Sequence, residues 1–311
     1  MSRLHGSSWQ VLTLWGIVAA LITVALAAAE GPRQEGRRSL TVEGRLGVMI
    51  YDDFVNNQSR TIYEVRQIAL DKKSEGRAWA LGDVEGLAEV EPGSMVRVTG
   101  HYDHTSDRLS GRIQILSPPD GSLESHNATT SYNMIVMLLN YSDVQLDPSC
   151  SNPVAINDKV FIATDSVAAY IHENSFHRVS LQGTVAGPFT LNLSQSSGCN
   201  ENVIVNKANK EATNAGYNLS QYTHRFYVLP TTPGCSNQGN VCGPLAWARG
   251  ACDHHVFAHE WGHNLGLRHA AVPENPSCNP YCDYGDFSST MGNYIAIPPG
   301  SNSYLRHFNA P

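Results

Sequence analysis

Three histidines and one glutamate between residues 259 and 269 have the types and the spacing of a metal-dependent hydrolytic site. His259 and His263 are four residues apart, so a helix would present both imidazoles on one face. Glu260 directly follows the first histidine and would stand beside a bound metal, where a general base is needed. His269 supplies a third imidazole. Three neutral nitrogen ligands leave a fourth position for water, which is typical of a catalytic rather than a structural zinc site.

The same segment predicts where its helix must end. Gly266 comes seven residues after His259, and glycine adopts without steric cost the left-handed conformation that ends many helices. An ordinary helix with surface histidines is the alternative, but the full pattern H-E-x-x-H-x-x-G-x-x-H arises by chance far less often than H-E-x-x-H. We therefore predict Zn²⁺ bound by His259, His263 and His269, because three imidazoles favour zinc, with Glu260 as the base.

A second motif follows the histidines. Met291 lies after 21 intervening residues, within the sequence S-T-M-G-N. Together the two motifs resemble the metzincin metalloproteases and their Met-turn. Residues 263–270 and 284–293 resemble in particular the gametolysin (algal autolysin) family of secreted, cell-wall-lytic zinc endopeptidases. The resemblance extends from Tyr132 to the end of the chain. It implies that Met291 packs beneath the zinc and that the substrates are cell-wall or extracellular-matrix glycoproteins.

Three features depart from related patterns. Ala270 follows the third histidine, where other metzincin subfamilies carry Asp or Glu. Tyr294 comes three residues after Met291, and families that use a tyrosine as an extra zinc ligand place it two residues after, so we do not assign it as a ligand. The sequence ends at Pro311, so we expect a truncated C-terminal subdomain. The alternative function is thus a catalytically impaired fragment that acts as a metal-binding or wall-binding module.

Latency is a further question that the resemblance raises. Some metzincins are inhibited by a propeptide cysteine that binds the zinc, but no cysteine precedes Cys150 here. Any latency must therefore use steric cover or another ligand. His101, Asp103 and His104 are one candidate group, although a polar turn is the more economical interpretation.

The N-terminus carries the features of a targeting segment. Arg3 and His5 precede an apolar run, and three alanines before Glu30 offer a cleavage site, so residues 1–29 are predicted to be a signal peptide. A signal anchor is the alternative, because the apolar run approaches the length of a membrane span. We expect a secreted protein with no membrane association after cleavage. Five N-x-S/T sequons agree with secretion: Asn57, Asn127, Asn140, Asn192 and Asn218.

All seven cysteines follow residue 149. In an oxidising compartment they favour disulfides over metal ligands. Short bridges between Cys278 and Cys282 and between Cys235 and Cys242 are possible pairings, although spacing does not fix connectivity. The odd number leaves one cysteine unpaired, or paired with a residue beyond the given sequence.

Patterning divides the chain into an N-terminal β-rich part and a larger α/β (α+β) part. Residues 30–116 are predicted to be a small β-rich, OB-like pro-domain, because short alternating segments are separated by turns. Residues 117–130 are polar and rich in breakers, which favours a linker. Residues 131–311 would form a metzincin-like domain with a mixed twisted sheet and an active-site helix. The net charge of −7 argues against nucleic acid as a partner. A protein or glycoprotein substrate is what the resemblance implies, and the oligomeric state is not predicted.

Periodicity suggests the elements of the larger part. The apolar run 134–139 predicts a strand buried on both faces, and Thr164 or Asp165 would cap a helix extending to Glu173. Strands are expected near 178–184, 203–205 and 225–229, with a helix over 206–215. Residues 243–248 are expected either to form an edge strand that pairs with substrate or to form a loop anchored by Trp247.

Overall fold

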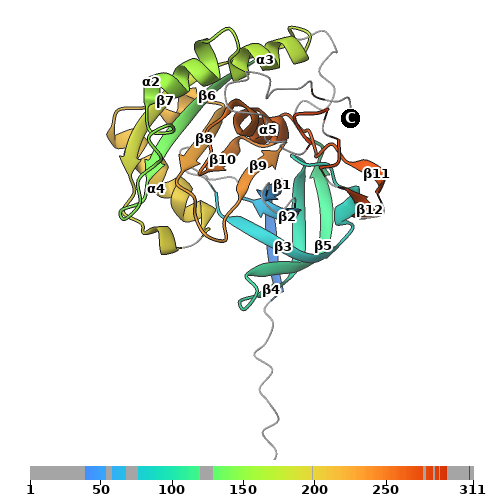
Figure 1. Cartoon of the computed structure of the whole chain (residues 1–311). Coiled ribbons are helices and arrows are strands. Elements are labelled where there is room, and N and C mark those ends of the chain that lie inside the picture. The colour runs from blue at the N-terminus through green and yellow to red at the C-terminus, as the bar shows by residue number, and fades with distance from the viewer. Residues whose placement is uncertain are drawn as a thin grey trace, which may run out of the picture. The chain divides into compact units, whose positions relative to one another are not determined.

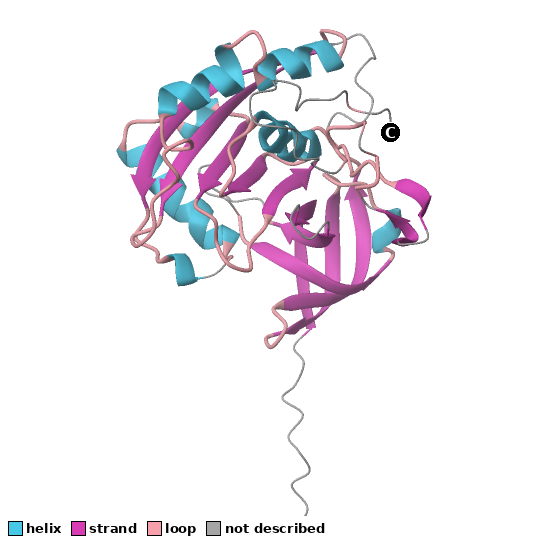
Figure 2. Cartoon of the chain, viewed as in Figure 1, coloured by secondary structure: helices cyan, strands magenta, loops and turns pink. Residues whose placement is uncertain are grey.

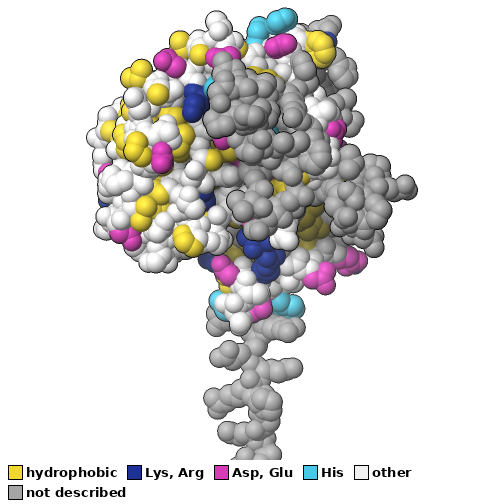
Figure 3. Space-filling view, viewed as in Figure 1, with side chains coloured by type: hydrophobic (Ala, Val, Ile, Leu, Met, Phe, Trp, Pro, Cys, Tyr) yellow, Lys and Arg dark blue, Asp and Glu magenta, His cyan; other side chains and the backbone are white. Residues whose placement is uncertain are grey.

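The computed structural model describes residues 39–53, 58–67, 76–119, 129–197, 199–275, 278–282, 284–286, 288–292 and 308, with side chains of 272–275 and 278–282 excepted. The predicted signal peptide and most of the predicted linker lie outside these residues. Among the described helices, none is both long enough and apolar enough to cross a membrane. On the face shown in Figure 3, hydrophobic, acidic and basic side chains are interspersed over the described surface.

Five strands near the N-terminus close into a ring. They are β1 (Ser39–Asp53), β2 (Gln58–Arg66), β3 (Ala78–Glu85), β4 (Met95–Asp103) and β5 (Arg108–Ser117), and the short helix η1 (Leu87–Glu89) follows β3. The strands pair in the order β1-β2-β3-β5-β4-β1, and β3 with β5 is a parallel pair. Alternate residues such as Leu46, Val65, Val98 and Leu109 fill the interior, which is the period-two pattern that the sequence predicts.

The remaining long strands extend β1 into a mixed sheet of ten strands. They are β6 (Thr130–Asn140), β7 (Val179–Thr190), β8 (His224–Leu229), β9 (Asn237–Val241) and β10 (Leu245–Arg249), in the order β1-β9-β10-β8-β6-β7. β9 runs antiparallel to both β1 and β10, whereas β10, β8, β6 and β7 are mutually parallel where they pair. A separate two-stranded sheet joins β11 (Val272–Asn275) and β12 (Cys278–Cys282). The predicted mixed α+β class is therefore confirmed.

Helices cover both faces of this sheet (Figures 1 and 2). One face carries α2 (Pro153–Asn157), η2 (Asp158–Ile162), α3 (Val167–Asn174) and α5 (His254–Asn264), and the other carries α4 (Glu201–Asn214). The short turns η3 (Gln195–Ser197) and η4 (Leu219–Gln221) flank α4. Along β6, Met134, Val136 and Leu138 face the first layer, while the residues between them face the second. Burial on both faces explains why this strand is a continuous apolar run.

Several details differ from the sequence-based expectations. The N-cap of α3 is Ser166, whose Oγ accepts a hydrogen bond from Ala169 N at 3.2 Å, rather than Thr164 or Asp165. Residues 203–205 are not a strand but lie in the first turns of α4, whose Asn200 cap starts the helix earlier than predicted. β10 is not an edge strand, because it pairs with β8 on one side and β9 on the other. Trp247 is fully buried, as expected for an anchor, but it lies in a central strand and not in a loop.

Two disulfides connect distant parts of the sheet layers. Cys150 bonds to Cys252, and Cys199 bonds to Cys235. The suggested Cys235–Cys242 bridge is therefore wrong, and Cys242 is a free, exposed thiol. The side chains of Cys278 and Cys282 lie outside the described residues, so their suggested bridge stays a prediction.

Candidate metal centre

The helix α5 begins and ends with well-formed caps. Asp253 precedes it, and its Oδ1 accepts a hydrogen bond from Val256 N at 3.0 Å. At the other end Gly266 has φ +94°. Gly266 N donates to His263 O at 2.9 Å, and Leu267 N donates to Gly262 O at 3.0 Å. This pair of bonds is a Schellman motif, which releases the chain toward His269 as the glycine position predicts.

Close packing holds α5 against the sheet beside β9 (Figure 1). A Cβ added to Gly239 of β9 would lie 2.4 Å from Glu260 O and 2.8 Å from His263 Cβ, so only glycine lets the strand approach the helix this closely. Trp261 is fully buried in the core on the other side of the helix. The positions of His259, Glu260 and His263 are thus fixed by the helix backbone, whereas His269 lies in the loop that follows it.

Met291 packs directly under the same helix. An added Cβ on Gly262 would lie 2.6 Å from the Met291 Sδ, and the Met291 side chain is buried. The turn that carries it is tied to the segment after the third histidine, because Ala270 N donates to Met291 O at 3.0 Å. Tyr170 Oη also donates to Thr290 Oγ1 at 2.7 Å. These contacts place the Met291 thioether below the histidine-bearing helix.

The structure brings the three predicted histidines together. The ring centroids of His259 and His263 are 5.0 Å apart, those of His259 and His269 are 5.4 Å apart, and those of His263 and His269 are 5.1 Å apart. All three are buried or nearly so, and one nitrogen from each, together with a carboxylate oxygen of Asp52, lies within 4.8 Å of the others. Asp52 is a fourth member of the cluster that the sequence did not identify.

Backbone carbonyls set the tautomers of two of these histidines. The Nδ1 of His259 lies 2.8 Å from Thr290 O, and the Nδ1 of His263 lies 2.8 Å from Leu267 O. A carbonyl can only accept, so each Nδ1 carries the proton and donates. The Nε2 atoms of both rings are then the ones turned toward the common centre, and such a hydrogen bond at the other ring nitrogen is typical of zinc-binding histidines. Burial lowers the pKa of His259 to about 4, which favours this neutral form.

The Asp52 carboxylate faces the three Nε2 atoms. Its Oδ2 lies 3.3 Å from His263 Nε2 and 3.6 Å from His259 Nε2, and its Oδ1 lies 2.6 Å from His269 Nε2. Burial alone would raise the Asp52 pKa, but the contacts with the imidazoles hold it well below its ordinary value. Tyr284 Oη donates to Asp52 Oδ1, and its ring centroid is 4.1 Å from that of His269. Tyr284 therefore fixes the orientation of the carboxylate.

Glu260 is fully buried, and neither of its carboxyl oxygens has a hydrogen-bond partner among the described residues. Burial, together with the nearby Asp52 charge, raises its pKa well above the ordinary value. A buried carboxylate such as that of Asp52 is costly unless a positive charge compensates it. A divalent cation at the centre of the Nε2 atoms would offset that charge, so the donor set fits zinc.

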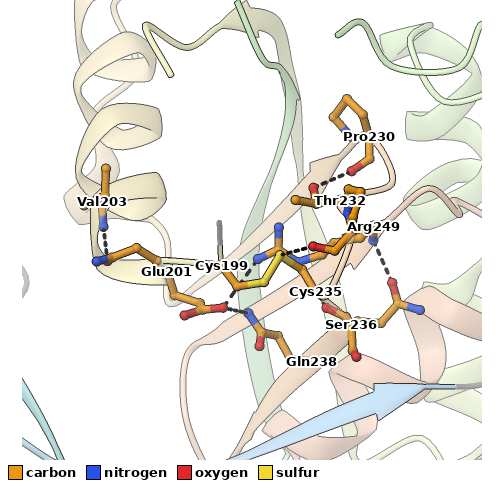
Figure 4. A network of polar contacts seen from close by, with 12 residues as sticks. Cys199, Glu201, Val203, Pro230, Thr232, Cys235, Ser236, Gln238 and Arg249 are labelled. Atoms are coloured by element: carbon orange, nitrogen blue, oxygen red, sulfur yellow. Dashed lines mark hydrogen bonds and ion pairs between the residues drawn. A yellow bond between two sulfur atoms is a disulfide. The ribbon is translucent and has the colours of Figure 1, made fainter. Parts of the chain in front are cut away.

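Polar contacts hold the neighbouring strands in place (Figure 4). The buried Arg249 of β10 donates through Nε to Ser236 O at 3.1 Å, and its Nη2 lies 3.5 Å from Glu201 Oε1. Gln238 of β9 donates to the same Glu201 oxygen at 3.0 Å. The Cys199–Cys235 disulfide bridges the start of α4 to the loop before β9. A cavity of about 450 Å³ lies here, lined in part by Asp52 and Arg249.

Two other histidines of α5 stay outside the cluster. His255 is one turn before His259, with ring centroids 5.6 Å apart, and is buried. Desolvation lowers the pKa of the half-buried His254. Asp103 is one of the residues considered for latency together with His101 and His104. It accepts hydrogen bonds from Thr105 and Ser106 in an exposed turn, as the polar-turn interpretation predicts.

The sequence did not assign Asp52, Tyr284, Thr290 or the Leu267 carbonyl to the site. Each of them reaches the histidines because of how the chain folds and not because it is part of the histidine motif. Asp52 follows Val48 and Ile50 at a spacing of two, so it occupies the buried face of β1. A carboxylate in phase with a buried apolar stripe is a signal that sequence alone could have offered. Tyr284, Thr290 and the Leu267 carbonyl have no such signal.

Comparison with known proteins agrees with the geometry of the centre. No curated protein matches the chain. A solved structure titled "Structure of a chaperone-substrate complex" matches over 75% of this chain with 14% identity and a TM-score of 0.32, and the chain spans 36% of that protein's length. The family model described as gametolysin peptidase M11 matches residues 130–311, which is more than half of the sequence. The chain therefore belongs to the gametolysin peptidase M11 family, a family of metallopeptidases.

Proposed function

We propose that this protein is a secreted, zinc-dependent endopeptidase in which Glu260 is the general base. The observation that carries the proposal is the convergence of three imidazoles, two from helix α5 and one from the loop after it, beside the buried Glu260. His259, His263 and His269 would hold the metal. When bound there, zinc supplies Lewis acidity toward an attacking water and the scissile carbonyl.

The protein's own groups would do the rest of the chemistry. The Glu260 carboxylate accepts the proton of the attacking water and later returns it to the leaving amine. The Thr290 and Leu267 carbonyls keep His259 and His263 in the tautomer that binds metal. Met291 supports the helix from below through its contact at Gly262. We propose in addition that residues 131–311 form a metzincin-like catalytic domain. The five strands β1–β5 would form an OB-like pro-domain.

The cellular location and the substrate are also proposals. Both disulfides suit an oxidising compartment. Asn192 and Asn218 are exposed, whereas Asn140 is buried and accepts a hydrogen bond from Leu146 N. Expression in a secreting eukaryotic host should therefore place the protein in the medium, with glycans on Asn192 and Asn218 and none on Asn140. Mass spectrometry of glycopeptides checks this, and an intracellular, unglycosylated product would contradict secretion.

The substrates that family membership suggests are cell-wall or extracellular-matrix glycoproteins. Incubation of the purified protein with a panel of such glycoproteins and with casein, with and without a chelator, tests this class. Cleavage of casein but of no matrix glycoprotein would contradict the substrate proposal while leaving the peptidase proposal intact. The alternative is a binding module, which would retain metal but cleave nothing before or after limited proteolysis of the chain.

The decisive experiment compares Glu260→Gln with Glu173→Gln, an exposed glutamate of α3, with peptidase activity measured before and after limited proteolysis. General acid–base groups contribute about 10² to 10⁴-fold to rate. Glu260→Gln should therefore lose at least about a hundredfold in peptidase activity while its zinc content by atomic absorption stays at one per chain. Glu173→Gln should match the unchanged protein in both measurements. A Glu260→Gln protein that cleaves at the original rate would refute the assignment of the base.

A further inference from the structure

The residue that closes the histidine cluster comes from the N-terminal ring of strands and lies 211 positions before His263, which it contacts. Asp52 is the second-last residue of β1, and its side chain is completely buried against the three imidazoles. A buried carboxylate is costly unless something compensates its charge. No step of the proposed peptidase chemistry uses it.

We propose that β1 is a built-in inhibitor of the peptidase site: the Asp52 carboxylate takes the fourth ligand position of the metal, and residues 48–52 occupy the strand edge at which an extended substrate would bind. The inference rests on the proposed function and deepens it, because it states that the intact chain is in an inhibited state.

Two of the three contacts between Asp52 and the imidazoles have the distances of a fourth ligand, whereas Oδ1 lies in direct hydrogen-bond contact with His269 Nε2 at 2.6 Å. Ligand atoms about 2.0–2.2 Å from one zinc ion in a tetrahedral arrangement lie about 3.3–3.6 Å from each other. Asp52 Oδ2 is 3.3 Å from His263 Nε2 and 3.6 Å from His259 Nε2. The Nδ1 atoms of both rings face carbonyls, so Nε2 is the ring atom that each histidine presents to Oδ2, and a metal between them would replace the direct contact of His263 Nε2 with Oδ2. A shared cation makes this arrangement favourable.

Neighbouring groups hold the carboxylate in this position. Tyr284 Oη donates to Asp52 Oδ1 and lies 3.3 Å from Gln58 O of β2. Tyr284 is itself buried beside His269. The hydroxyl therefore connects the peptidase part of the chain to both strands of the β1–β2 pair and orients Asp52 toward the histidines. A carboxylate with no role at the site would not need the hydrogen bond from Tyr284 to orient it.

The backbone of β1 covers the strand next to the metal ligands. Val48–Asp52 pairs antiparallel with β9, from Val48 opposite Val241 to Asp52 opposite Asn237. β10 occupies the other side of β9, so β1 completes the only remaining edge of that strand. Gly239 at the middle of β9 touches the backbone of Glu260.

Peptides commonly bind by adding a strand to an open sheet edge. A peptide paired with β9 would run directly past the metal ligands, and it would have to displace β1 to do so. The Asp52 carboxylate and the β1 backbone thus exclude water and substrate together. This arrangement is a form of latency that needs no cysteine.

The test measures access to the metal rather than turnover. The intact chain is loaded with Co²⁺, whose visible spectrum reports coordination, and is titrated with acetohydroxamate, a small chelating anion. Asp52→Ala opens the fourth position, and Asp53→Ala is the matched control because the neighbouring side chain points to the other face of β1. If the open state of the intact chain is populated at about 1–10%, its apparent affinity for the probe falls about 10- to 100-fold.

We expect Asp52→Ala to bind acetohydroxamate at least about tenfold more tightly than the unchanged protein and Asp53→Ala to bind it equally. Asp52→Asn keeps the shape of the side chain with a weaker ligand and should be intermediate; it carries the test if Asp52→Ala does not fold. Equal affinity in all four proteins, or an equal gain in Asp53→Ala, would overturn the inference and leave the peptidase proposal standing. Failure of every form to bind Co²⁺ would instead contradict the metal site itself.

Discussion

His224 offers a test of the core behind the active-site helix. It is the first residue of β8 and only 8% exposed, and its ring packs edge-on against Tyr132 at 4.8 Å and against Trp261 at 6.1 Å. Desolvation lowers its pKa from 6.5 to about 4. The folded protein therefore keeps His224 neutral over a pH range in which the unfolded chain protonates it.

The direction of the stability change follows from this difference. Between pH 6.5 and pH 4 the unfolded state binds more protons at this position, so the free energy of unfolding falls as the pH falls. With the two pKa values above, the contribution lost relative to pH 8 is about 2 kcal/mol at pH 5 and about 3 kcal/mol at pH 4. The contribution is fully present above pH 6.5.

The measurement is urea denaturation at several pH values between 7.5 and 5. His224→Phe preserves a buried ring but cannot titrate, so its loss of stability over this range should be about 2 kcal/mol smaller than that of the unchanged protein. Other titrating groups, including the metal-site histidines, are common to both proteins and cancel in the comparison. His101→Phe, at an exposed position of β4, should retain the original pH dependence. If His224→Phe also shows that same dependence, the reasoning from burial is wrong.

Two further predictions concern the framework of the site. Replacing both Cys150 and Cys252 by serine removes a bond that joins residues 102 positions apart, and chain entropy predicts a loss of about 5 kcal/mol in the free energy of unfolding, measured by denaturation with and without a reductant. A loss below about 1 kcal/mol would contradict this account. Gly266→Ala forces a side chain into the left-handed conformation at φ +94°, 3.1 Å from Cys242 Sγ, and should lower stability by about 1–2 kcal/mol and weaken zinc binding, because the turn to His269 is strained. Unchanged zinc affinity in Gly266→Ala, measured by competition with a chromogenic chelator, would show that this turn does not position the ligand.

The sequence identified the part of the site whose geometry is local. His259, His263 and Gly266 lie within three helical turns, so the helix repeat alone sets their relation, and the structure places them accordingly. Strands buried on both faces, such as β6, were also predictable because their apolar run has no polar face. Residues 203–205 misled because three apolar β-branched residues in a row fit a strand and the first turns of a capped helix equally well.

Long-range pairing was out of reach for physical reasons. Whether a short strand is central or at an edge depends on partners that no local pattern encodes, which is why β10 was misplaced as an edge. Asp52 was missed because its partners lie more than 200 residues away, and its only local sign was its phase with Val48 and Ile50. The disulfides were misassigned for the same reason, since Cys235 pairs across the fold with Cys199 rather than with its near neighbour Cys242.

The ladder between β1 and β9 also has a consequence for solubility. If the N-terminal strands departed, the amide and carbonyl groups along one side of Asn237–Val241 would face solvent. Such an uncovered edge accepts any extended chain, including one from a second copy of the same protein. The strand that we propose as an inhibitor would therefore also protect the protein from self-association. Without β1, the short length of β9, five residues, would be left to limit aggregation through this edge.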